Sequence, residues 1–317
     1  MDSQTARHAK YDALIARCAG LDPVRTAVVH PCDAASLESA VQAGAAGIIL
    51  PILVGPEAKI RRVAQDNNID ISGLTIVSTP HSHAAAARAV EMVRAGEAAA
   101  LMKGSLHTDE VMGAVVCRTT GIRTVRRVSH VFIMDVPTYH KLLFITDAAV
   151  NIAPTLDDKV DIVANAIELA QALGVERPKV AILSAVETVN AKIPSTIDAA
   201  ALCKMAERGQ IKGGILDGPL AFDNAISHEA AIAKGIVSPV AGDADILLVP
   251  DMVSGNMLAK ELTFLANADA AGIVLGARVP IILTSRADSV RSRLASCAVA
   301  AIYAHARSVL ATGMPAE

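Results

Sequence analysis

Short apolar runs alternate with longer amphipathic segments along most of this chain, and that alternation restricts its fold more than any other feature. In the first part, the apolar runs predict four strands, at 26–30, 47–54, 74–78 and 98–103. Between and after them, amphipathic patterns predict four helices, at 33–43, 56–66, 81–95 and 108–119. This order is typical of a mostly parallel, doubly wound sheet with helices on both faces.

The alternation breaks once, where the predicted strands 128–135 and 141–147 are separated only by "VPTYHK". A gap this short permits a hairpin but no crossover helix, so these two strands are predicted to be antiparallel. After the hairpin, strands are predicted at 179–185, 213–218, 244–251, 271–277 and 279–284, and helices at 156–173, 195–208, 223–234, 255–266 and 288–311.

We therefore expect two doubly wound, mostly parallel α/β domains. The hairpin marks the border of the second domain. With only "GAR" between two later strands, the chain is expected to cross back to the first domain near 276–278. The first domain is predicted to be discontinuous, over 1–128 plus 278–317, and the second to cover 129–277.

The amino-acid composition narrows the class of protein. Of the 317 residues, 52% are hydrophobic but only 2% are aromatic. The core must therefore be built from Ala, Val, Ile and Leu, which suits helices packed closely on a parallel sheet. A formal net charge of −3 and so few aromatic side chains argue against a nucleic-acid partner. The five cysteines form no CxxC pair, which excludes zinc-site spacing and favours a reducing compartment.

Two further observations predict a cytoplasmic protein with no membrane partner. Charged residues stand in the N-terminal segment where a signal peptide would have its apolar core. The most apolar run, "AAGIILPILVG", is interrupted by Pro51 and is too short to span a bilayer.

Polar side chains collect in the segments that follow the predicted strands, where doubly wound sheets bind their ligands. The candidates there are Lys103, Thr108, Asp147, Asn151, Asp217, Asp251, Asn256, Lys260, Ser285 and Arg286. Glycines lie among them, at 104, 218 and 255, where the backbone must turn sharply or approach a ligand. The aspartates could instead cap helices or turns, and Asn256 and Lys260 could share an exposed helix face. Five loops at the predicted strand ends carry such residues, and their occurrence together favours a binding site.

Motifs for several other chemistries are missing from the sequence. No GxGxxG follows a strand and no GxxxxGK[ST] occurs, so neither a dinucleotide site nor a phosphate-binding loop of that type is supported. There is no GxSxG nucleophile turn, and the acidic residues are not paired at metal-ligand spacing. The sequence therefore favours group transfer without a metal or a tightly bound cofactor over redox chemistry or hydrolysis.

Four loops in order, "ITDAAVNIAPT", "ILDGPLAFDNAIS", "LLVPDMVSGNMLAKEL" and "PIILTSRADS", resemble the phosphate acetyl/butyryltransferase family over about 98–297. The resemblance implies reversible transfer of a short acyl group, acetyl first and butyryl next, between coenzyme A and inorganic phosphate. It also implies an architecture like that of isocitrate and isopropylmalate dehydrogenases, with the active cleft between two domains, and a homodimer. Acyl-CoA and phosphate would be substrates, and no cofactor would be tightly bound.

The resemblance also implies roles for individual residues. Ser285 and Arg286 would bind substrate and assist catalysis. The substrate-binding residues would be Lys103, Thr108, Asp147, Asn151, Asp217, Gly218, Pro219, Asp251, Gly255, Asn256 and Lys260. In the acetyltransferase branch an Asp seven residues after the Ser is the expected base for the coenzyme A thiol, but here that position is Ser292. Met112 and Gly113 stand where the family has an arginine.

The chemistry of the residues fits this reaction. Arg286 and the start of the helix near 288 could bind phosphate, and Ser285 could donate a hydrogen bond to the oxyanion. The candidates for the base are Asp288, Asp147 and Asp251, and Asp288 ranks first because it lies in the same loop. Direct transfer needs only the positioning of two ligands, without a covalent enzyme intermediate.

The helix that follows this loop is predicted to pack one face, with Val290, Leu294, Cys297 and Ala301, on the core. Asp288 or Ser289 would cap it. Ser292 would point away from the buried face, and Arg291 and Arg293 would lie on opposite flanks. That geometry leaves Arg286 as the main anion ligand.

Two other functions remain open on the sequence alone. A non-catalytic, acyl-CoA-binding regulatory module, of the kind that malic enzymes carry, would explain the missing Asp at position 292. A metal-dependent dehydrogenase of the isopropylmalate type would share the fold class, but the sequence lacks the carboxylate cluster that such an enzyme needs.

Overall fold

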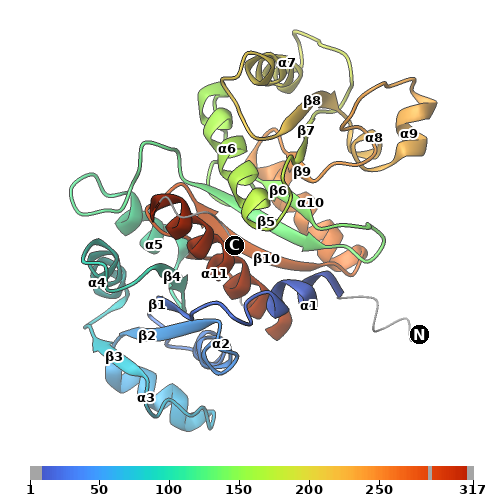
Figure 1. Ribbon diagram of the computed structural model, residues 1–317. Coiled ribbons are helices and arrows are strands. Elements are labelled where there is room, and N and C mark those ends of the chain that lie inside the picture. Colours follow the sequence, from blue (N-terminus) through green and yellow to red (C-terminus); the bar gives the residue numbers. More distant parts are fainter. Residues whose placement is uncertain (1–8, 285–287, 313–317) are drawn as a thin grey trace, which may run out of the picture. The chain divides into compact units, whose positions relative to one another are not determined.

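The computed structural model describes residues 9–284 and 288–312 (Figure 1). The chain packs as two compact units. Unit 1 comprises residues 1–10 and 127–270, and unit 2 comprises residues 11–126 and 271–317. The mixed α/β class predicted from the alternation is confirmed, whereas the division into domains at the bounds given above stays a prediction.

Unit 2 is built on parallel strands in the order β3-β2-β1-β4-β11. Their bounds are β1 (Val24–Val29), β2 (Ile49–Gly55), β3 (Thr75–Ser78), β4 (Ala100–Lys103) and β11 (Ile281–Ile282). The strand β10 (Asp269–Leu275) pairs antiparallel with β11 through Ile273 and Ile282. The helices are α2 (Ala34–Ala45), α3 (Glu57–Asp66), α4 (Ser82–Arg94), α5 (Thr108–Val116) and α11 (Val290–Thr312). A short helix, α1 (Ala9–Ala16), precedes β1 and was not predicted.

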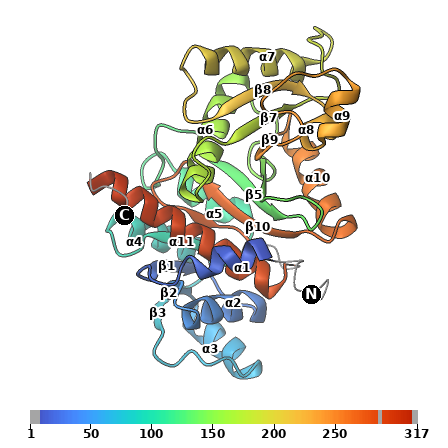
Figure 2. The ribbon, with the colours of Figure 1, turned by 45° about the vertical axis from the view of Figure 1, so that its right-hand side comes forward.

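The helices of unit 2 lie on both faces of these strands, as the doubly wound pattern predicts. Helices α2 and α3 lie on one side of β1, β2 and β3, and α4 lies on the other (Figures 1 and 2). Helix α4 packs on α5, and α11 packs on α2. This arrangement follows from right-handed crossovers, because the chain moves outward from β1 to β3 and then returns across them to β4.

Unit 1 has the strand order β5-β6-β9-β7-β8. The strands are β5 (Ser129–Asp135), β6 (Leu143–Thr146), β7 (Lys179–Leu183), β8 (Ile215–Leu220) and β9 (Ile246–Leu248). The β5–β6 pair is antiparallel, as predicted from the short gap between the two strands, and the other pairs are parallel. The helices are α6 (Leu156–Ala172), α7 (Pro194–Glu207), α8 (Phe222–Ile226), α9 (His228–Ala233) and α10 (Met252–Leu265).

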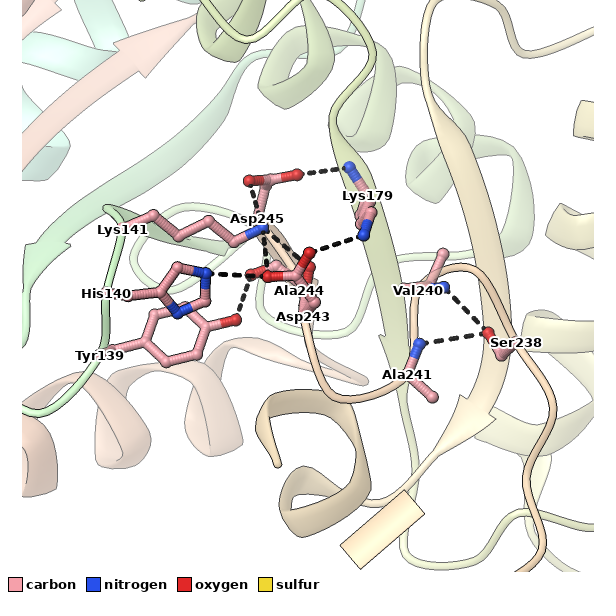
Figure 3. A network of polar contacts seen from close by, with 10 residues as sticks. All are labelled: Tyr139, His140, Lys141, Lys179, Ser238, Val240, Ala241, Asp243, Ala244 and Asp245. Atoms are coloured by element: carbon pink, nitrogen blue, oxygen red, sulfur yellow. Dashed lines mark hydrogen bonds and ion pairs between the residues drawn. The ribbon is translucent and has the colours of Figure 1, made fainter. Parts of the chain in front are cut away.

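A network of ion pairs anchors the β5–β6 hairpin to the start of β7 and β9 (Figure 3). Asp243 lies between Lys141, at 3.0 Å, and Lys179, at 2.6 Å. Lys141 also reaches Asp245 at 2.8 Å. The Tyr139 hydroxyl donates to the Ala244 carbonyl at 2.7 Å. The hairpin turn is thereby tied to the loop that enters β9.

Several sequence predictions about elements are wrong in detail. The helix expected at 223–234 is two short helices, because Ser227 is extended (φ −124°, ψ 117°) and its hydroxyl caps α9. The helix expected at 108–119 ends at Val116, and His107 takes its N-cap position. Residues 217–219 belong to strand β8 and not to the loop that follows it. None of the helices within residues 9–284 and 288–312 is long and apolar enough to cross a membrane.

For helix α11 the predicted cap is confirmed, whereas the predicted buried face is wrong. Ser289, one of the two predicted caps, accepts the Ser292 N–H with its Oγ at 3.1 Å. Ser292 itself is buried, with 4% of its surface exposed, whereas Val290 is 47% exposed. The prediction assumed one buried stripe, but residues 295–303 are buried on all sides of the helix. Along residues 295–303 the helix is covered on more than one side, so a single apolar stripe does not describe which of its residues are buried.

Candidate active site

The first group of candidate residues lies in unit 1, in the loop that follows β6. Asp147 is buried, and its two carboxylate oxygens accept hydrogen bonds from its own loop. Oδ1 accepts the N–H groups of Ala149 and Val150, at 2.9 and 3.0 Å. Oδ2 accepts both the N–H and the side-chain Nδ2 of Asn151, at 3.2 and 2.5 Å. Asp147 therefore holds the backbone of the loop in place, and its oxygens are occupied.

Asn151 connects this loop to the start of β5. Its Nδ2 also donates to the Val128 carbonyl at 2.9 Å, and its Oδ1 accepts from Arg127 Nε at 2.7 Å. Arg127 in turn lies 3.3 Å from Asp158 in the first turn of α6. Sequence reasoning missed Arg127, although the basic pair Arg126–Arg127 directly before the predicted strand 128–135 was a visible signal.

His130 lies on β5 beside this loop and is fully buried. Neither ring nitrogen has a hydrogen-bond partner among the residues that the structure describes. Burial lowers the pKa of His130 to about 4, although the charge of Asp147 acts to raise it. Because the cost of desolvating a charged imidazole exceeds the attraction of the carboxylate, the ring is neutral at neutral pH.

The start of α10 packs against the same loop. Asp251 caps the helix, with its Oδ1 accepting from Ser254 N at 2.8 Å and from Ser254 Oγ at 2.9 Å. A Cβ at Gly255 would lie 2.7 Å from Val249 and 3.0 Å from the Asp147 carbonyl, so only glycine fits. Asn256 Nδ2 donates to the Ala148 carbonyl at 3.2 Å. The structure thus brings Asp147, Asn151, Asp251, Gly255 and Asn256 together, and Lys260 lies exposed one turn further along α10.

A mostly apolar hollow of about 290 Å³ adjoins these residues at the carboxyl ends of β7 and β9. Its lining includes Ser184, Phe222, Ser254 and Leu258. Ser254 is the residue that Asp251 holds at the start of α10. The edge of unit 1 therefore offers a polar loop beside an apolar recess.

Asp217, Gly218 and Pro219 do not join this group. They lie within β8, which pairs only with β7 among the described strands and is three strands away from β6. At about 4.8 Å per strand, that separation is on the order of 14 Å. A Cβ at Gly218 would lie 2.7 Å from the Ile182 carbonyl, so this glycine permits close packing of the two strands.

The second group of candidate residues lies in unit 2, in the loop that follows β4. Gly104 N–H donates to the Val29 carbonyl at 2.9 Å, and Ser105 N–H donates to the His30 carbonyl at 3.0 Å. The Ser105 hydroxyl accepts the Cys32 N–H at 3.1 Å. These bonds join the loop after β4 to the loop after β1. Burial, together with the nearby Lys59 charge, lowers the pKa of His30.

Lys103 and Arg293 line the same small hollow, of about 20 Å³, together with Thr284 and the start of α2. Arg293 Nη1 donates to the Ala35 carbonyl at 3.1 Å and to Ser39 Oγ at 3.2 Å. Arg291 instead pairs with Asp12 at 2.8 Å. The two arginines do lie on different flanks of α11, as expected. However, Arg293 lies at the carboxyl edge beside Lys103, a position that helix periodicity alone did not indicate.

Ser285 and Arg286 lie outside the described residues. Asp288 is partly buried and precedes the cap of α11. Ser292, at the position of the family's expected Asp, is buried and its Oγ accepts from Ser289 Oγ at 3.1 Å. Within the described parts of the chain, no group of three or more His, Cys, Asp or Glu residues is placed to hold a metal ion.

Comparison with known proteins gives consistent matches. Residues 81–301 match the family described as Phosphate acetyl/butaryl transferase. A phosphate acetyltransferase from Rhizobium meliloti is 66% identical over 95% of this chain and 96% of that protein. A phosphate butyryltransferase from Clostridium acetobutylicum is 42% identical over 93% of this chain and 98% of that protein. The crystal structure of a branched-chain phosphotransacylase from Enterococcus faecalis V583 has a TM-score of 0.77 at 32% identity, covering 89% of this chain and 99% of that one.

Proposed function

Because this chain belongs to the phosphate acetyl/butyryl transferase family, we propose that it is a phosphate acyltransferase whose preferred acyl group is acetyl. The reaction is the reversible transfer of the acyl group between coenzyme A and inorganic phosphate, which gives acyl phosphate and free coenzyme A. The choice of acetyl rests on one observation. The chain is 66% identical to a phosphate acetyltransferase and 42% identical to a phosphate butyryltransferase at nearly equal coverage.

We assign the phosphate side of the reaction to the carboxyl edge of unit 2. Lys103 and Arg293 line one hollow at this edge, and Thr284 in the same hollow directly precedes Ser285 and Arg286. Guanidinium groups bind phosphate oxygens in a bidentate manner, and a lysine adds a point charge. In this assignment Arg286 binds the phosphate group of the acyl phosphate, and the Ser285 hydroxyl donates to the oxyanion of the tetrahedral intermediate. Thr108 lies in the same loop region, at the start of α5.

The base that accepts the thiol proton of coenzyme A is assigned to Asp288. Asp147 is not assigned as the base, because its oxygens accept hydrogen bonds from three backbone N–H groups and one side chain. Asp251 is held by the N–H and hydroxyl of Ser254. Asp288 precedes the α11 cap in the same loop as Ser285 and Arg286, where its carboxylate would be close to the reacting groups.

The reaction needs no covalent intermediate on the enzyme. Once Asp288 takes the thiol proton, the sulfur attacks the carbonyl carbon of the acyl phosphate. The carbonyl oxygen becomes an oxyanion, and the intermediate then collapses with loss of phosphate. The polar loop of unit 1, with Asn151, Asn256 and Lys260, and its apolar recess are assigned to the coenzyme A moiety. The roles of Asp217, Gly218 and Pro219 stay predictions, as does the homodimer.

The experiment is a thiol-release assay with phosphate and a series of acyl-CoA substrates from acetyl to pentanoyl. We expect free coenzyme A to appear, with the highest kcat/KM for acetyl-CoA. A higher value for butyryl-CoA would overturn the acetyl preference, and no release with any substrate would overturn the activity itself.

The assigned base has its own test. Asp288→Asn should lower kcat by about a hundredfold or more, because proton transfer by a positioned group contributes at least that much. The matched control is Asp66→Asn, at the exposed end of α3, which should leave kcat unchanged. Full activity in Asp288→Asn would show that another residue is the base.

A further inference from the structure

Four arginines surround an open hollow of about 470 Å³ in unit 2, away from the residues assigned above. Arg94 is the last residue of α4, Arg118 and Arg123 lie in the segment after α5, and Arg278 lies between β10 and β11. All four side chains are exposed, and Cys117 lies in the same lining.

The backbone holds these arginines close to one another. Arg278 N–H donates to the Ile122 carbonyl at 2.9 Å, and Arg123 forms an antiparallel bridge with Ala277. The Thr124 hydroxyl donates to the Gly276 carbonyl at 2.6 Å. Arg123 and Arg278 are therefore presented by two paired segments, and their proximity does not depend on the side-chain conformation of either residue.

The turn that carries Arg118 is fixed as well. Gly121 N–H donates to the Cys117 carbonyl at 3.0 Å. A Cβ at Gly121 would lie 2.4 Å from that carbonyl, so the turn closes only around glycine. Arg94 Nη1 donates to the Thr120 carbonyl of the same turn at 3.4 Å. The arginines thus come from three segments that are bonded together.

The hollow contains positive charge without a neutralising carboxylate. Within residues 9–284 and 288–312, none of the four arginines forms an ion pair with Asp or Glu, and no acidic residue is in the lining. Other arginines of unit 2 do have such partners, for example Arg61 with Glu57 at 2.7 Å and Arg88 with Glu91 at 2.9 Å. The chain has 32 acidic and 29 basic side chains, so this is a local separation of charge and not the result of an overall excess. Clustered guanidinium groups repel one another unless an anion lies between them.

The position of the hollow separates it from the assigned site. Arg94 precedes β4, whereas Lys103 ends it. Arg278 precedes β11, whereas Thr284 follows it. Since β4 and β11 are parallel, the four arginines lie at the amino ends of these strands and the assigned residues lie at the carboxyl ends. One small anion cannot contact both groups.

We propose that this hollow is a second anion site, which binds a small molecule that carries at least two phosphoryl groups. Each planar guanidinium can bind two phosphate oxygens, so four of them match the charge and oxygen count of a diphosphate better than those of a single phosphate. A groove of about 890 Å³ between α4 and α5 shares Arg94 and Cys117 with the hollow and has small residues such as Ala87 and Ala114 in its lining. That groove has room for the organic part of such a ligand.

Cys117 provides a reporter that does not depend on activity. Hydrogen bonds from Thr120 and Thr119 lower the pKa of its thiol to about 6. Burial raises the pKa of the other four thiols, to about 11 for Cys32 and to about 12 for Cys203. Because the thiolate is the reactive form, iodoacetamide at neutral pH should modify Cys117 first.

The experiment follows the alkylation of Cys117 by mass spectrometry at about 0.15 M salt. The probe is inorganic pyrophosphate, and inorganic phosphate is the comparison. We expect saturating pyrophosphate to slow alkylation about fivefold or more, because the bound anion covers the thiol, and phosphate to have a smaller effect at equal concentration. An unchanged rate with pyrophosphate overturns the proposal, as does an equal effect of phosphate.

Three variants locate the effect. The double variant Arg118→Gln/Arg123→Gln should lose the protection, while its acyl transfer in the absence of pyrophosphate stays unchanged, which shows that it is folded. The matched double variant Arg61→Gln/Arg62→Gln, which removes two exposed arginines of α3 in the same unit, should keep the protection. Arg286→Gln should also keep it. The proposed site is overturned if protection survives in Arg118→Gln/Arg123→Gln. It is also overturned if protection is lost in either of the other two variants.

Discussion

The side-chain amide of Asn151 donates to Asp147 Oδ2 at 2.5 Å, so that two residues four positions apart close the loop after β6 on itself. The same amide reaches the Val128 carbonyl, and the Asn151 oxygen accepts from Arg127. Each polar atom of this side chain is therefore used, and the loop depends on it for its shape.

Replacement of Asn151 should accordingly cost stability as well as activity. In Asn151→Ala, a buried Asp147 oxygen and Arg127 Nε each lose a partner, and we expect the free energy of unfolding to fall by about 1–3 kcal/mol. Urea denaturation measures this change. Asn67→Ala removes an exposed side chain that donates to the Val63 carbonyl and should change stability by less than about 0.5 kcal/mol. Equal losses in the two variants would contradict the structural role of Asn151.

Gly104 provides a test of the loop that carries Lys103. A Cβ at this position would lie 2.4 Å from the Val29 carbonyl oxygen and 2.6 Å from that of His30, and neither backbone atom can move aside easily. Gly104→Ala should therefore displace the loop and lower kcat/KM for acyl transfer by at least about tenfold, since misplacement of a binding group is costly. Gly113→Ala on α5 meets nothing within 4 Å and should leave kcat/KM unchanged. That control should gain a little stability, because Ala favours the helix.

Introducing the family's carboxylate at position 292 should not supply a base. Ser292 is only 4% exposed, and its hydroxyl lies against Ser289 inside the first turn of α11. In Ser292→Asp a charged carboxylate would be placed in a buried position, so the midpoint of urea unfolding should fall and kcat should not rise. A kcat above that of the unmodified protein would show that position 292 reaches the reacting groups. Ser292→Ala serves as the control for the loss of the hydroxyl alone.

Asp243 links stability to pH through its two lysine partners. Burial acts to raise the pKa of Asp243, but hydrogen bonds from Lys179 and Lys141 and their charges lower it to about 2. The ordinary value is 3.8, so the folded state favours the charged form by about 2 kcal/mol. A lowered pKa in the folded state stabilises the protein above pH 3.8, and this contribution is lost as the pH falls towards 2.

The measurement is the free energy of unfolding as a function of pH for the unmodified protein and for Asp243→Asn. The two curves should lie apart above about pH 4 and approach each other near pH 2. Curves that run parallel over the whole range would contradict the contribution of this ion pair network.

The residues of the sequence by themselves determined the kinds of element and their order. The strands β1, β2 and β4 and the helices α2, α3 and α6 begin and end within a few residues of the positions that periodicity predicts, because a run of apolar residues or an amphipathic repeat is a local property of the chain. The short gap after β5 was enough to predict the antiparallel hairpin, because no crossover fits in it. The order of the loops was also enough to predict which strand ends carry polar residues.

Only the tertiary structure decided what each polar residue does. Asp147 and Asp251 looked like possible bases, but their oxygens hold a loop and a helix start. Asp217 looked like a loop residue, but it lies in the outer strand β8. Helix periodicity placed Arg293 on the flank opposite Arg291 and gave it no part in binding the anion. In the structure it lies beside Lys103, which is 190 positions earlier in the chain. The physical reason is that the partner of a side chain is set by which segments pack together, and segments far apart in sequence leave no periodic signal of their contact.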